Sequence, residues 1–469
     1  MTTPTNPAPV NNSDFASLKL PKSALDNLSS LGYKAMTPIQ EQSLPLAFKG
    51  HDLIAKAKTG SGKTAAFSLP ILNKLNIRFF AVQAIILCPT RELSSQVAKE
   101  IRRLARYQQN IKVVTLCGGQ PIGPQIGSLE HGAHIVVGTP GRIKDHLQKR
   151  TLILDDVNTF VLDEADRMLD MGFYEDIENI IQHTPSERQT LLFSATYPDK
   201  IKQLSSDFQK DPIEISVESV HSNSQIEQIF YQVSRSKKDD ATYQLLLSHQ
   251  ISSAVIFCNT KICCQEVSDY LSAHGFNALA LHGDLEQRDR DDVLIRFSNK
   301  SCSILVATDV AARGLDIDDL QAVINYDLSR DNDIYTHRIG RTGRAGKSGL
   351  ALSIYTESEK YKLEAIEDSQ QQPITYGDIK RIENTENMMP AQPTMTTLCI
   401  FGGRKQKVRP GDILGALTGE AGIQGKCVGK IDVTDFSSYV AIEREYAKEA
   451  LQRLLDGKIK GRKFKAKLL

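Results

Sequence analysis

One short segment near the N-terminus combines glycines, a lysine and a threonine in an order suited to holding phosphate groups. It reads AKTGSGKT, residues 57–64, and follows the short apolar stretch DLIA. Gly60 and Gly62 allow backbone conformations that turn N–H groups toward an anion. Lys63 can reach the terminal phosphates and Thr64 can ligate Mg²⁺, in front of the positive end of a helix. The segment predicts a nucleotide site made of Ala57, Lys58, Thr59, Gly60, Ser61, Gly62, Lys63 and Thr64.

A second segment, DEAD at residues 163–166, ends the apolar run TFVL. Ligands of open α/β sheets bind outside the carboxyl ends of the strands. We expect Asp163 to hold Mg²⁺ through water, and Glu164 to orient and deprotonate an attacking water. Ala57 stands where the usual phosphate loop has glycine. Taken alone, the first segment could be a Gly-rich turn before a helix, and the second could be an acidic cluster that caps a helix. Together the two segments predict ATP hydrolysis, with Thr64 and Asp163 as the Mg²⁺ ligands.

These residues need a scaffold, and the apolar pattern supplies one. Short runs such as AIILC (84–88), HIVVG (134–138), AVIFC (254–258) and ILVAT (304–308) alternate with helical stretches such as 91–106 and 261–274. This alternation predicts βαβ units with parallel sheets. Polar sequence divides the runs into two α/β lobes. The expected organisation is a disordered tail at 1–14, lobes at 15–217 and 226–367, linkers at 218–225 and 368–394, and a further domain at 395–469.

The last 75 residues, from Met395 onward, follow another pattern. Strand-like TLCIFGG, a helix from Pro410, the strands GKIDV and SSYVAIE, a helix at 445–455 and a strand over 458–469 give the order β-α-β-β-α-β. RNA-recognition modules use this order. The segment holds 15 Lys and Arg against 8 Asp and Glu, although the whole chain carries only +1. Attraction to RNA phosphates is one explanation, and a solvated edge strand protected by lysines is the other.

Composition narrows the class of protein further. No stretch approaches the roughly 18 apolar residues of a membrane helix, and the N-terminus lacks the features of a secretion signal. None of the eight cysteines form C-x-x-C, and several lie inside apolar strand patterns. We expect buried, reduced thiols in a cytoplasmic protein with no metal beyond Mg²⁺. A monomer is expected.

The ordered motifs resemble those of the DEAD-box RNA helicases across the whole of both lobes. GYKAMTPIQ (32–40) resembles the adenine-reading motif, PTREL, GG and TPGR the RNA contacts of the first lobe, and SAT (194–196) the coupling segment. VIFCNT, Gln287-x-x-Arg290, ATDVAARGLD and HRIGRTGRAG are similar to second-lobe motifs. The resemblance implies two tandem RecA-like lobes that close on ATP and RNA together, which couples RNA binding to hydrolysis.

The resemblance also implies a role for individual residues. Tyr33, Gln40 and Asp316 would bind the adenine and ribose of ATP, while Arg341 and Arg344 would act as arginine fingers. Coupling would involve Asp166, Ser194, Thr196 and His337. Contacts to RNA phosphates and 2′-OH groups would come from Pro89, Thr90, Arg91, Gly119, Thr139, Arg142, Thr260, Gln287, Arg290, Thr308 and Arg313. Such contacts read RNA as a class and not as a sequence.

Selectivity would then come from the RRM-like C-terminal α+β domain. The segments TLCIFGGRKQKVRPGDILGALTG and GKIKG resemble the bacterial DbpA-type subfamily, which implies large-subunit assembly and docking on 23S rRNA. Cys399 stands where a stacking aromatic is expected, and only Tyr439 remains of the usual aromatic set. Contacts from loops and the basic edge are therefore expected, from Arg404, Lys405, Lys407, Lys460, Arg462 and Lys463, in addition to Tyr439.

Three functions fit these motifs. The first is an ATP-dependent RNA helicase with RNA-stimulated ATPase, recruited to rRNA by its C-terminal domain. The second is an ATP-gated RNA clamp or scaffold that hydrolyses ATP without productive unwinding, and the same motifs serve both. The third, a DNA helicase, is disfavoured by the RNA-type C-terminal domain.

Overall fold

The computed structural model describes residues 14–57, 60–196, 199–217, 226–312, 320–343, 348–370, 373–382, 388–419 and 422–469. The linker expected at 218–225 and most of the expected N-terminal tail lie outside these ranges. The second lobe and the C-terminal domain belong to one compact unit, and the first lobe forms another. No helix within the described ranges combines the length and apolar character that crossing a membrane requires.

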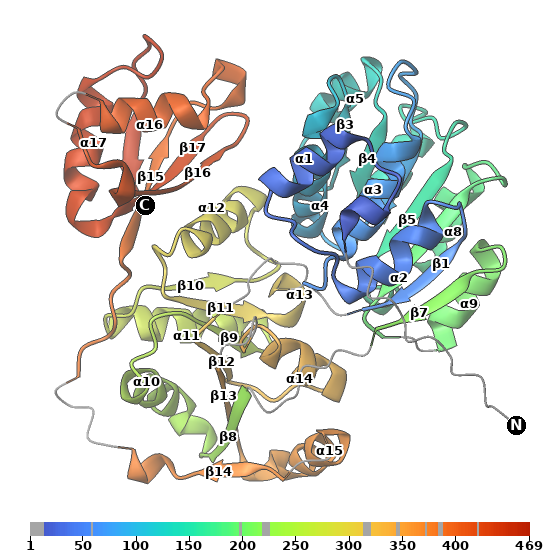
Figure 1. Cartoon of the computed structure of the whole chain (residues 1–469). Helices are drawn as coiled ribbons and strands as arrows, with labels where there is room; N and C mark the ends of the chain where they lie inside the picture. The colour runs from blue at the N-terminus through green and yellow to red at the C-terminus, as the bar shows by residue number, and fades with distance from the viewer. Residues whose placement is uncertain are drawn as a thin grey trace, which may run out of the picture. The chain divides into compact units, whose positions relative to one another are not determined.

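The first lobe is a parallel seven-stranded sheet with helices on its faces (Figure 1), in the order β3-β4-β2-β5-β6-β1-β7. Its strands are β1 Leu53–Lys56, β2 Ala84–Leu87, β3 Val113–Leu116, β4 Ile135–Gly138, β5 Thr159–Asp163, β6 Gln189–Ser194 and β7 Ile213–Ser216. Its helices are α1 Lys22–Ser30, α2 Pro38–Ala47, α3 Lys63–Lys74, α4 Arg91–Leu104, α5 Gly123–Glu130, α6 Pro140–Gln148, α7 Ala165–Asp170, α8 Tyr174–Gln182 and α9 Asp199–Phe208.

The second lobe repeats this architecture. Its sheet runs β10-β11-β9-β12-β13-β8-β14, which is the strand order of the first lobe counted from β8. The strands are β8 Ile226–Gln232, β9 Ala254–Cys258, β10 Ala278–Leu281, β11 Ile304–Thr308, β12 Ala322–Asn325, β13 Gly349–Tyr355 and β14 Thr375–Gly377. The helices are α10 Lys238–Ser248, α11 Lys261–Ala273, α12 Gln287–Ser298, α13 Asp309–Ala312, α14 Asn332–Ile339 and α15 Lys360–Gln370. Two tandem RecA-like lobes are therefore confirmed.

The boundary of the second lobe differs from the sequence prediction. We expected a connector over 368–394, yet α15 continues to Gln370 and β14 pairs in parallel with β8. Thr375 lies opposite Ile229 in this register, so the short strand extends the sheet at its edge. A three-residue strand with two exposed positions carries too little apolar period to be recognised in a sequence.

The C-terminal domain is a four-stranded antiparallel sheet in the order β16-β17-β15-β18, with α16 and α17 packed against it (Figure 1). Its elements are β15 Met395–Ile400, α16 Pro410–Thr418, β16 Val428–Val433, β17 Ser438–Glu443, α17 Ala447–Asp456 and β18 Ala466–Leu468. The predicted β-α-β-β-α-β order is confirmed. The last strand is shorter than predicted, because Ile459 and Arg462 bridge across a turn in which Lys460 and Gly461 adopt positive φ.

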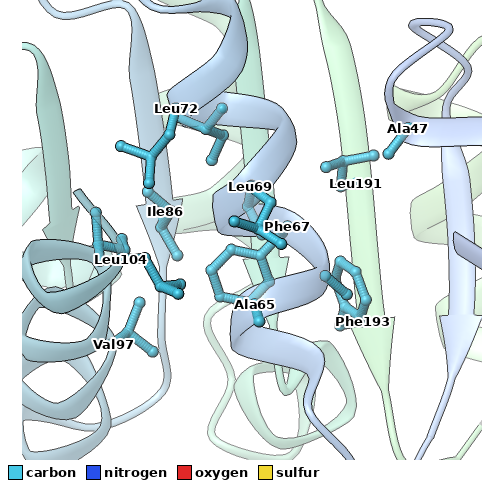
Figure 2. Packing of buried hydrophobic residues seen from close by; sticks show 14 of the residues in the cluster. Ala47, Ala65, Phe67, Leu69, Leu72, Ile86, Val97, Leu104, Leu191 and Phe193 are labelled. Carbon is cyan, nitrogen blue, oxygen red and sulfur yellow. The ribbon is translucent and has the colours of Figure 1, made fainter. Parts of the chain in front are cut away.

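The core of the first lobe forms where α3 lies on the sheet. Figure 2 shows Phe67 of α3 directed toward Phe193 of β6, and their ring centroids are 5.4 Å apart at an interplanar angle of 61°. Both rings are fully buried. Apolar residues of α4, including Val97 and Leu104, approach α3 from its other side. This packing holds the helix that begins at Lys63 at a fixed place on the sheet.

We predict that Phe67→Ala lowers the free energy of unfolding of the first lobe by about 3–5 kcal/mol, the usual cost of removing a buried aromatic ring. Urea unfolding followed by circular dichroism measures the change. The matched control is Ile153→Ala, since that side chain is 65% exposed, and it should stay within about 0.5 kcal/mol of the parent. Equal effects of the two substitutions would show that α3 is not anchored by this contact.

Candidate active site and nucleic-acid interface

The glycine-rich segment lies between β1 and α3, and the structure describes it from Gly60 onward. Gly60 and Gly62 have φ values of 81° and 95°, which glycine adopts without strain. A Cβ at Gly62 would lie only 2.4 Å from Gln40 Nε2, so any side chain at this position would displace Gln40. Lys63 is the first residue of α3. The N–H groups at the start of this helix therefore face the end of the loop, as an anion site requires.

Two charged groups are buried together at this edge of the sheet. The Lys63 ammonium and Asp163 Oδ1 are both buried, and neither has a hydrogen-bond partner within the described residues. Burial raises the pKa of Asp163 to about 6, whereas the nearby Lys63 charge lowers it. Buried charged groups whose atoms lack a partner within the protein are suited to a site that a ligand, an ion or water completes. A triphosphate with Mg²⁺ would supply an anion for the lysine and a cation for the carboxylate.

Strand order explains why these residues meet. β6 lies between β1 and β5, with Lys56 opposite Ser194 and Asp163 opposite Phe193. Parallel strands end at the same edge of a sheet, so the phosphate loop, the acidic segment and the SAT segment share that edge. Thr64 lies half-buried in the first turn of α3. The residues that we predicted for ATP hydrolysis within the first lobe are thus brought together.

The acidic segment is held in a specific conformation. Glu164 adopts the left-handed region at φ 55° and ψ 51°, a strained geometry for a non-glycine residue. Asp166 accepts hydrogen bonds from the backbone N–H groups of Ala195 and Thr196 at 3.2 and 3.0 Å, and from the Thr196 hydroxyl at 3.0 Å. The Ser194 hydroxyl donates to the Thr196 carbonyl at 2.6 Å. The acidic and SAT segments are therefore physically connected.

The residues expected to bind adenine make contacts of their own. Gln40 Oε1 accepts from the Thr37 N–H at 3.0 Å, and Gln40 Nε2 donates to the Gly62 carbonyl at 3.0 Å. The Tyr33 hydroxyl donates to Glu100 at 2.8 Å, and this ring packs edge-on against Phe15 at 6.0 Å. The Gln40 amide thus connects α2 directly to the phosphate loop. Recognition of adenine by Tyr33 and Gln40 stays a prediction.

Three loops of the first lobe bring the expected RNA contacts to the carboxyl ends of β2, β3 and β4. Arg91 begins α4 behind Pro89 and the capping residue Thr90, whose hydroxyl accepts from the Leu93 N–H at 3.2 Å. The guanidinium of Arg91 covers Gly119, where a Cβ would lie 1.7 Å from Nη1. A side chain at this position would displace the Arg91 guanidinium, and the φ of 75° also favours glycine. Thr139 precedes α6, and Arg142 Nη2 donates to the Gln120 carbonyl at 3.1 Å, which connects the second and third loops.

The corresponding edge of the second lobe is organised by an arginine to which the sequence analysis gave no role. Arg338 of α14 is 2% exposed, and its Nε and Nη2 donate to both carboxylate oxygens of Asp309 at 2.6 and 2.7 Å. It also bonds the Asn325 side chain, the Asp327 carbonyl and the Asn259 side chain at 3.2, 2.6 and 3.1 Å. One guanidinium therefore connects the loops that follow β9, β11 and β12. The motif HRIGRTGR contains three arginines, and no sequence signal separates the internal one from the others.

The remaining second-lobe residues lie around this network. Thr260 caps α11, Thr308 ends β11, and Gln287 and Arg290 lie in the first turn of α12, where Arg290 Nη1 donates to the His282 carbonyl at 3.2 Å. His337 belongs to α14, and Arg341 follows that helix. Five predicted site residues lie outside the described ranges, namely Lys58, Thr59, Arg313, Asp316 and Arg344.

A basic surface of the C-terminal domain is formed by residues 404–407 and 460–463. The first segment is fixed by hydrogen bonds from the Arg404 and Lys405 N–H groups to the Thr434 and Asp435 carbonyls, both at 2.9 Å. Lys460 Nζ lies 3.5 Å from the Lys407 carbonyl, which places the two segments side by side. The charged residues of this surface are all exposed, namely Arg404, Lys405, Lys407, Lys460, Arg462 and Lys463.

Tyr439 differs from these exposed residues. Its side chain is buried, its hydroxyl donates to Asp292 of α12 at 2.7 Å, and burial together with this bond raises its pKa. Thr397 on the same sheet face bonds Ser301 and Asn299 at 2.6 and 3.1 Å. In this structure the sheet face therefore contacts the second lobe and leaves Tyr439 no room to stack on a base. The basic surface provides the exposed alternative.

Comparison with known proteins agrees with this geometry. Residues 37–204 match the DEAD/DEAH box helicase family, residues 237–346 the helicase conserved C-terminal domain, and residues 397–468 the DbpA RNA binding domain. The chain belongs to the DEAD-box ATP-dependent RNA helicases, and it is therefore an ATP-hydrolysing enzyme.

Individual relatives extend the match along the whole chain. The chain is 51% identical to the ATP-dependent RNA helicase DbpA of Escherichia coli K12, over 96% of this chain and 98% of that protein. Identity to the helicase CshA of Listeria monocytogenes is 45%, over 76% of this chain and 68% of that protein. Among solved structures, Saccharomyces cerevisiae Dbp5 bound to RNA and ADP BeF3 has a TM-score of 0.71 at 30% identity, covering 78% of this chain and 96% of that one.

We predict that Glu164→Gln lowers ATP turnover about 10²–10⁴-fold, because the amide cannot accept a proton from water. Lys63→Ala should abolish ATP turnover, because it removes the cation that faces the phosphates. A phosphate-release assay measures the rates, and circular dichroism verifies folding. The matched control is Asp170→Asn, an exposed acid on α7 that pairs with Arg167. Normal turnover in Glu164→Gln would remove this residue from the mechanism.

We predict that Arg338→Gln lowers the free energy of unfolding of the second lobe by about 3 kcal/mol, since it leaves Asp309 without its buried partner. Urea unfolding detects the change. Arg330→Gln is the control, because that arginine is exposed. If the two variants were equally stable, the Arg338 network would not hold the three loops together.

Proposed function

We propose that this helicase hydrolyses ATP in response to RNA and separates short RNA duplexes locally. ATP hydrolysis is supported mainly by the buried pair of Lys63 and Asp163. Lys63 Nζ and Asp163 Oδ1 have no hydrogen-bond partner among the described residues. In this proposal Lys63 binds the terminal phosphates, and Glu164 accepts the proton of the attacking water. Asp166 and Thr196 transmit the state of the site to the rest of the lobe through their direct hydrogen bonds.

The same site fits Mg²⁺. Oxygen ligands suit this ion, and Thr64 and Asp163 offer a hydroxyl and a carboxylate at the end of the phosphate loop. When bound, Mg²⁺ would neutralise charge on the phosphates. Lys63 and the N–H groups of the loop would orient the nucleotide. Asp163 would keep its carboxylate ionised beside the cation.

Hydrolysis would need residues from both lobes. Lys63, Asp163 and Glu164 belong to the first lobe, whereas Arg341 belongs to the second. Arginine fingers of this kind are worth about 10³–10⁵ in rate in other nucleotide hydrolases. We therefore propose that RNA stimulates turnover by favouring the state in which Arg341 and Arg344 complete the site. RNA phosphates would bind at the helix starts marked by the half-buried Arg91 and Thr139, and at the capped start of α11 at the exposed Thr260.

The RNA target is the most specific part of the proposal. We propose that the C-terminal domain directs the helicase to 23S rRNA during assembly of the large ribosomal subunit, as a cytoplasmic monomer. Three observations support RNA binding by this domain: the match of residues 397–468 to the DbpA RNA binding domain, the basic surface, and the contact that removes Tyr439 from solvent. With the sheet face covered, RNA contacts would fall on the loops of the basic surface.

We predict that removing residues 395–469 leaves a weak ATPase that responds equally to all RNAs. The full chain should respond more strongly to fragments of 23S rRNA than to 16S rRNA or unrelated RNA. The readout is the ATPase rate against the concentration of each RNA. A truncated chain that still prefers 23S rRNA would exclude recruitment by this domain.

A point variant sharpens the same prediction without deleting a domain. Lys405→Gln with Lys460→Gln removes two charges of the basic surface, and the salt slope of RNA binding should fall by about one for each lost phosphate contact. The control is Lys19→Gln with Lys22→Gln, which removes two exposed charges from the first lobe. An equal loss of 23S rRNA preference in both double variants would assign the preference to net charge alone.

A further inference from the structure

Two thiols and one carboxylate converge in the second lobe, at the carboxyl end of β9. Cys258 is the last residue of that strand, Cys263 lies in the first turn of α11, and Asp327 follows the neighbouring strand β12. The two sulfurs and a carboxylate oxygen all lie within 4.8 Å of one another. Cys258 is buried and the other two residues are half-buried, so the group is reachable from solvent on one side.

The spacing fits a tetrahedral zinc site. Zinc–sulfur bonds of about 2.3 Å and zinc–oxygen bonds of about 2.0–2.2 Å place the ligand atoms of a tetrahedron roughly 3.5–3.8 Å apart. Cys263 Sγ already lies 3.9 Å from Asp327 Oδ2, and all three ligand atoms lie within 4.8 Å of one another, so the side chains would have to move closer to bind the ion. Two sulfur ligands favour a thiophilic ion such as Zn²⁺ over Mg²⁺ or Ca²⁺, which prefer oxygen. The half-buried side leaves a fourth position for water.

The surrounding charges balance such an ion. Lys238 Nζ lies 3.0 Å from Asp327 Oδ1, and this lysine is itself buried. A divalent cation with two thiolates, one carboxylate and one ammonium forms a neutral group, and buried groups need such compensation. Lys238 also lies 3.6 Å from Glu359, whose charge is offset by Lys362 at 3.4 Å. The Asn259 N–H donates to Asp327 Oδ2 at 3.0 Å and orients the carboxylate, as outer ligands do in metal sites.

The neighbouring cysteine does not belong to the group. Cys264 is buried, and its thiol contacts the Val306 carbonyl at 2.9 Å, toward the interior of the lobe. It therefore provides a matched comparison, since it differs from Cys263 by one position and is also a thiol in the first turns of α11.

We propose that Cys258, Cys263 and Asp327 form a binding site for one Zn²⁺ ion, and that the ion clamps the loop between β9 and α11. The clamped loop carries Thr260, whose hydroxyl accepts from the Cys263 N–H at 3.2 Å. It also carries Asn259, which bonds the buried Arg338 at 3.1 Å. A bound ion would thus hold both ends of the segment 258–263 and restrict its motion. This role is additional to ATP hydrolysis and does not depend on the RNA target.

The first test is titration of the full-length chain with Cd²⁺ under reducing conditions. Cadmium reports thiolate ligands through its ultraviolet charge-transfer absorption, and Zn²⁺ should displace it. The parent chain and Cys264→Ser should bind one Cd²⁺ with the absorption of two thiolates. Cys263→Ser, at a half-exposed position that tolerates serine, should lose half of that absorption and bind at least about 100-fold more weakly.

Equal Cd²⁺ binding by the parent and Cys263→Ser would overturn the proposal. An equal loss of Cd²⁺ binding in Cys263→Ser and Cys264→Ser would also overturn it. Circular dichroism verifies that each variant is folded. Amide hydrogen exchange gives an independent readout. Zn²⁺ should slow exchange in the peptide covering 258–264 of the parent, and it should leave Cys263→Ser unchanged. Stoichiometric binding with no change in exchange would exclude the clamp.

Discussion

The burial of Lys63 beside Asp163 is the constraint on which the active site depends. An ammonium and a carboxylate are both removed from water there, and neither reaches a hydrogen-bond partner within the described residues. Such groups destabilise a folded chain unless a ligand or another stabilising feature compensates them. The compensation must come from the rest of the lobe in the absence of ligand, through the packing of α3 on the sheet at Phe67 and Phe193. Stability of the core thus permits a site that is poised for ATP and Mg²⁺.

The two lobes use the same edge of the same sheet in different ways. Their strand orders are identical, so the carboxyl ends of equivalent strands lie in equivalent positions. In the first lobe this edge holds the glycine-rich segment and two buried charged side chains, each with an atom that has no hydrogen-bond partner among the described residues. In the second lobe Arg338 donates five hydrogen bonds to polar groups of the loops at this edge, two of them to Asp309. One fold therefore supports an edge with unpartnered buried charges and an edge whose described loops are joined by one buried arginine.

Sequence patterns predicted the regular part of this molecule well. The runs at 84–88, 134–138, 254–258 and 304–308 became buried central strands, because parallel strands covered on both faces are continuously apolar. Short or exposed elements were not predicted. The strand β14 has only three residues, and the turn at 459–462 interrupts an apparently regular alternation. Local patterns predict burial within an element, and they carry little information about an edge strand.

The site was predictable to the extent that each motif acts within one loop. The glycines of the phosphate loop and the bonds of Asp166 to Thr196 follow from local chemistry and strand order. Arg338 received no role and Tyr439 was expected to contact RNA, because the environment of both side chains comes from distant residues. The guanidinium reaches loops up to 79 positions away, and the Tyr439 hydroxyl bonds a residue 147 positions earlier. Contacts across such distances depend on the tertiary fold.

The proposed activity of this helicase is the separation of RNA strands with the energy of ATP hydrolysis. The most direct measurement is release of a labelled strand from a short duplex joined to a 23S rRNA fragment, with ATP or a non-hydrolysable analogue. Repeated strand release is expected with ATP and little strand release with the analogue. Release with ATP should be slower when the 23S rRNA fragment is absent. Strand retention with both nucleotides, at full ATPase activity, would contradict the proposed strand separation and identify an RNA clamp.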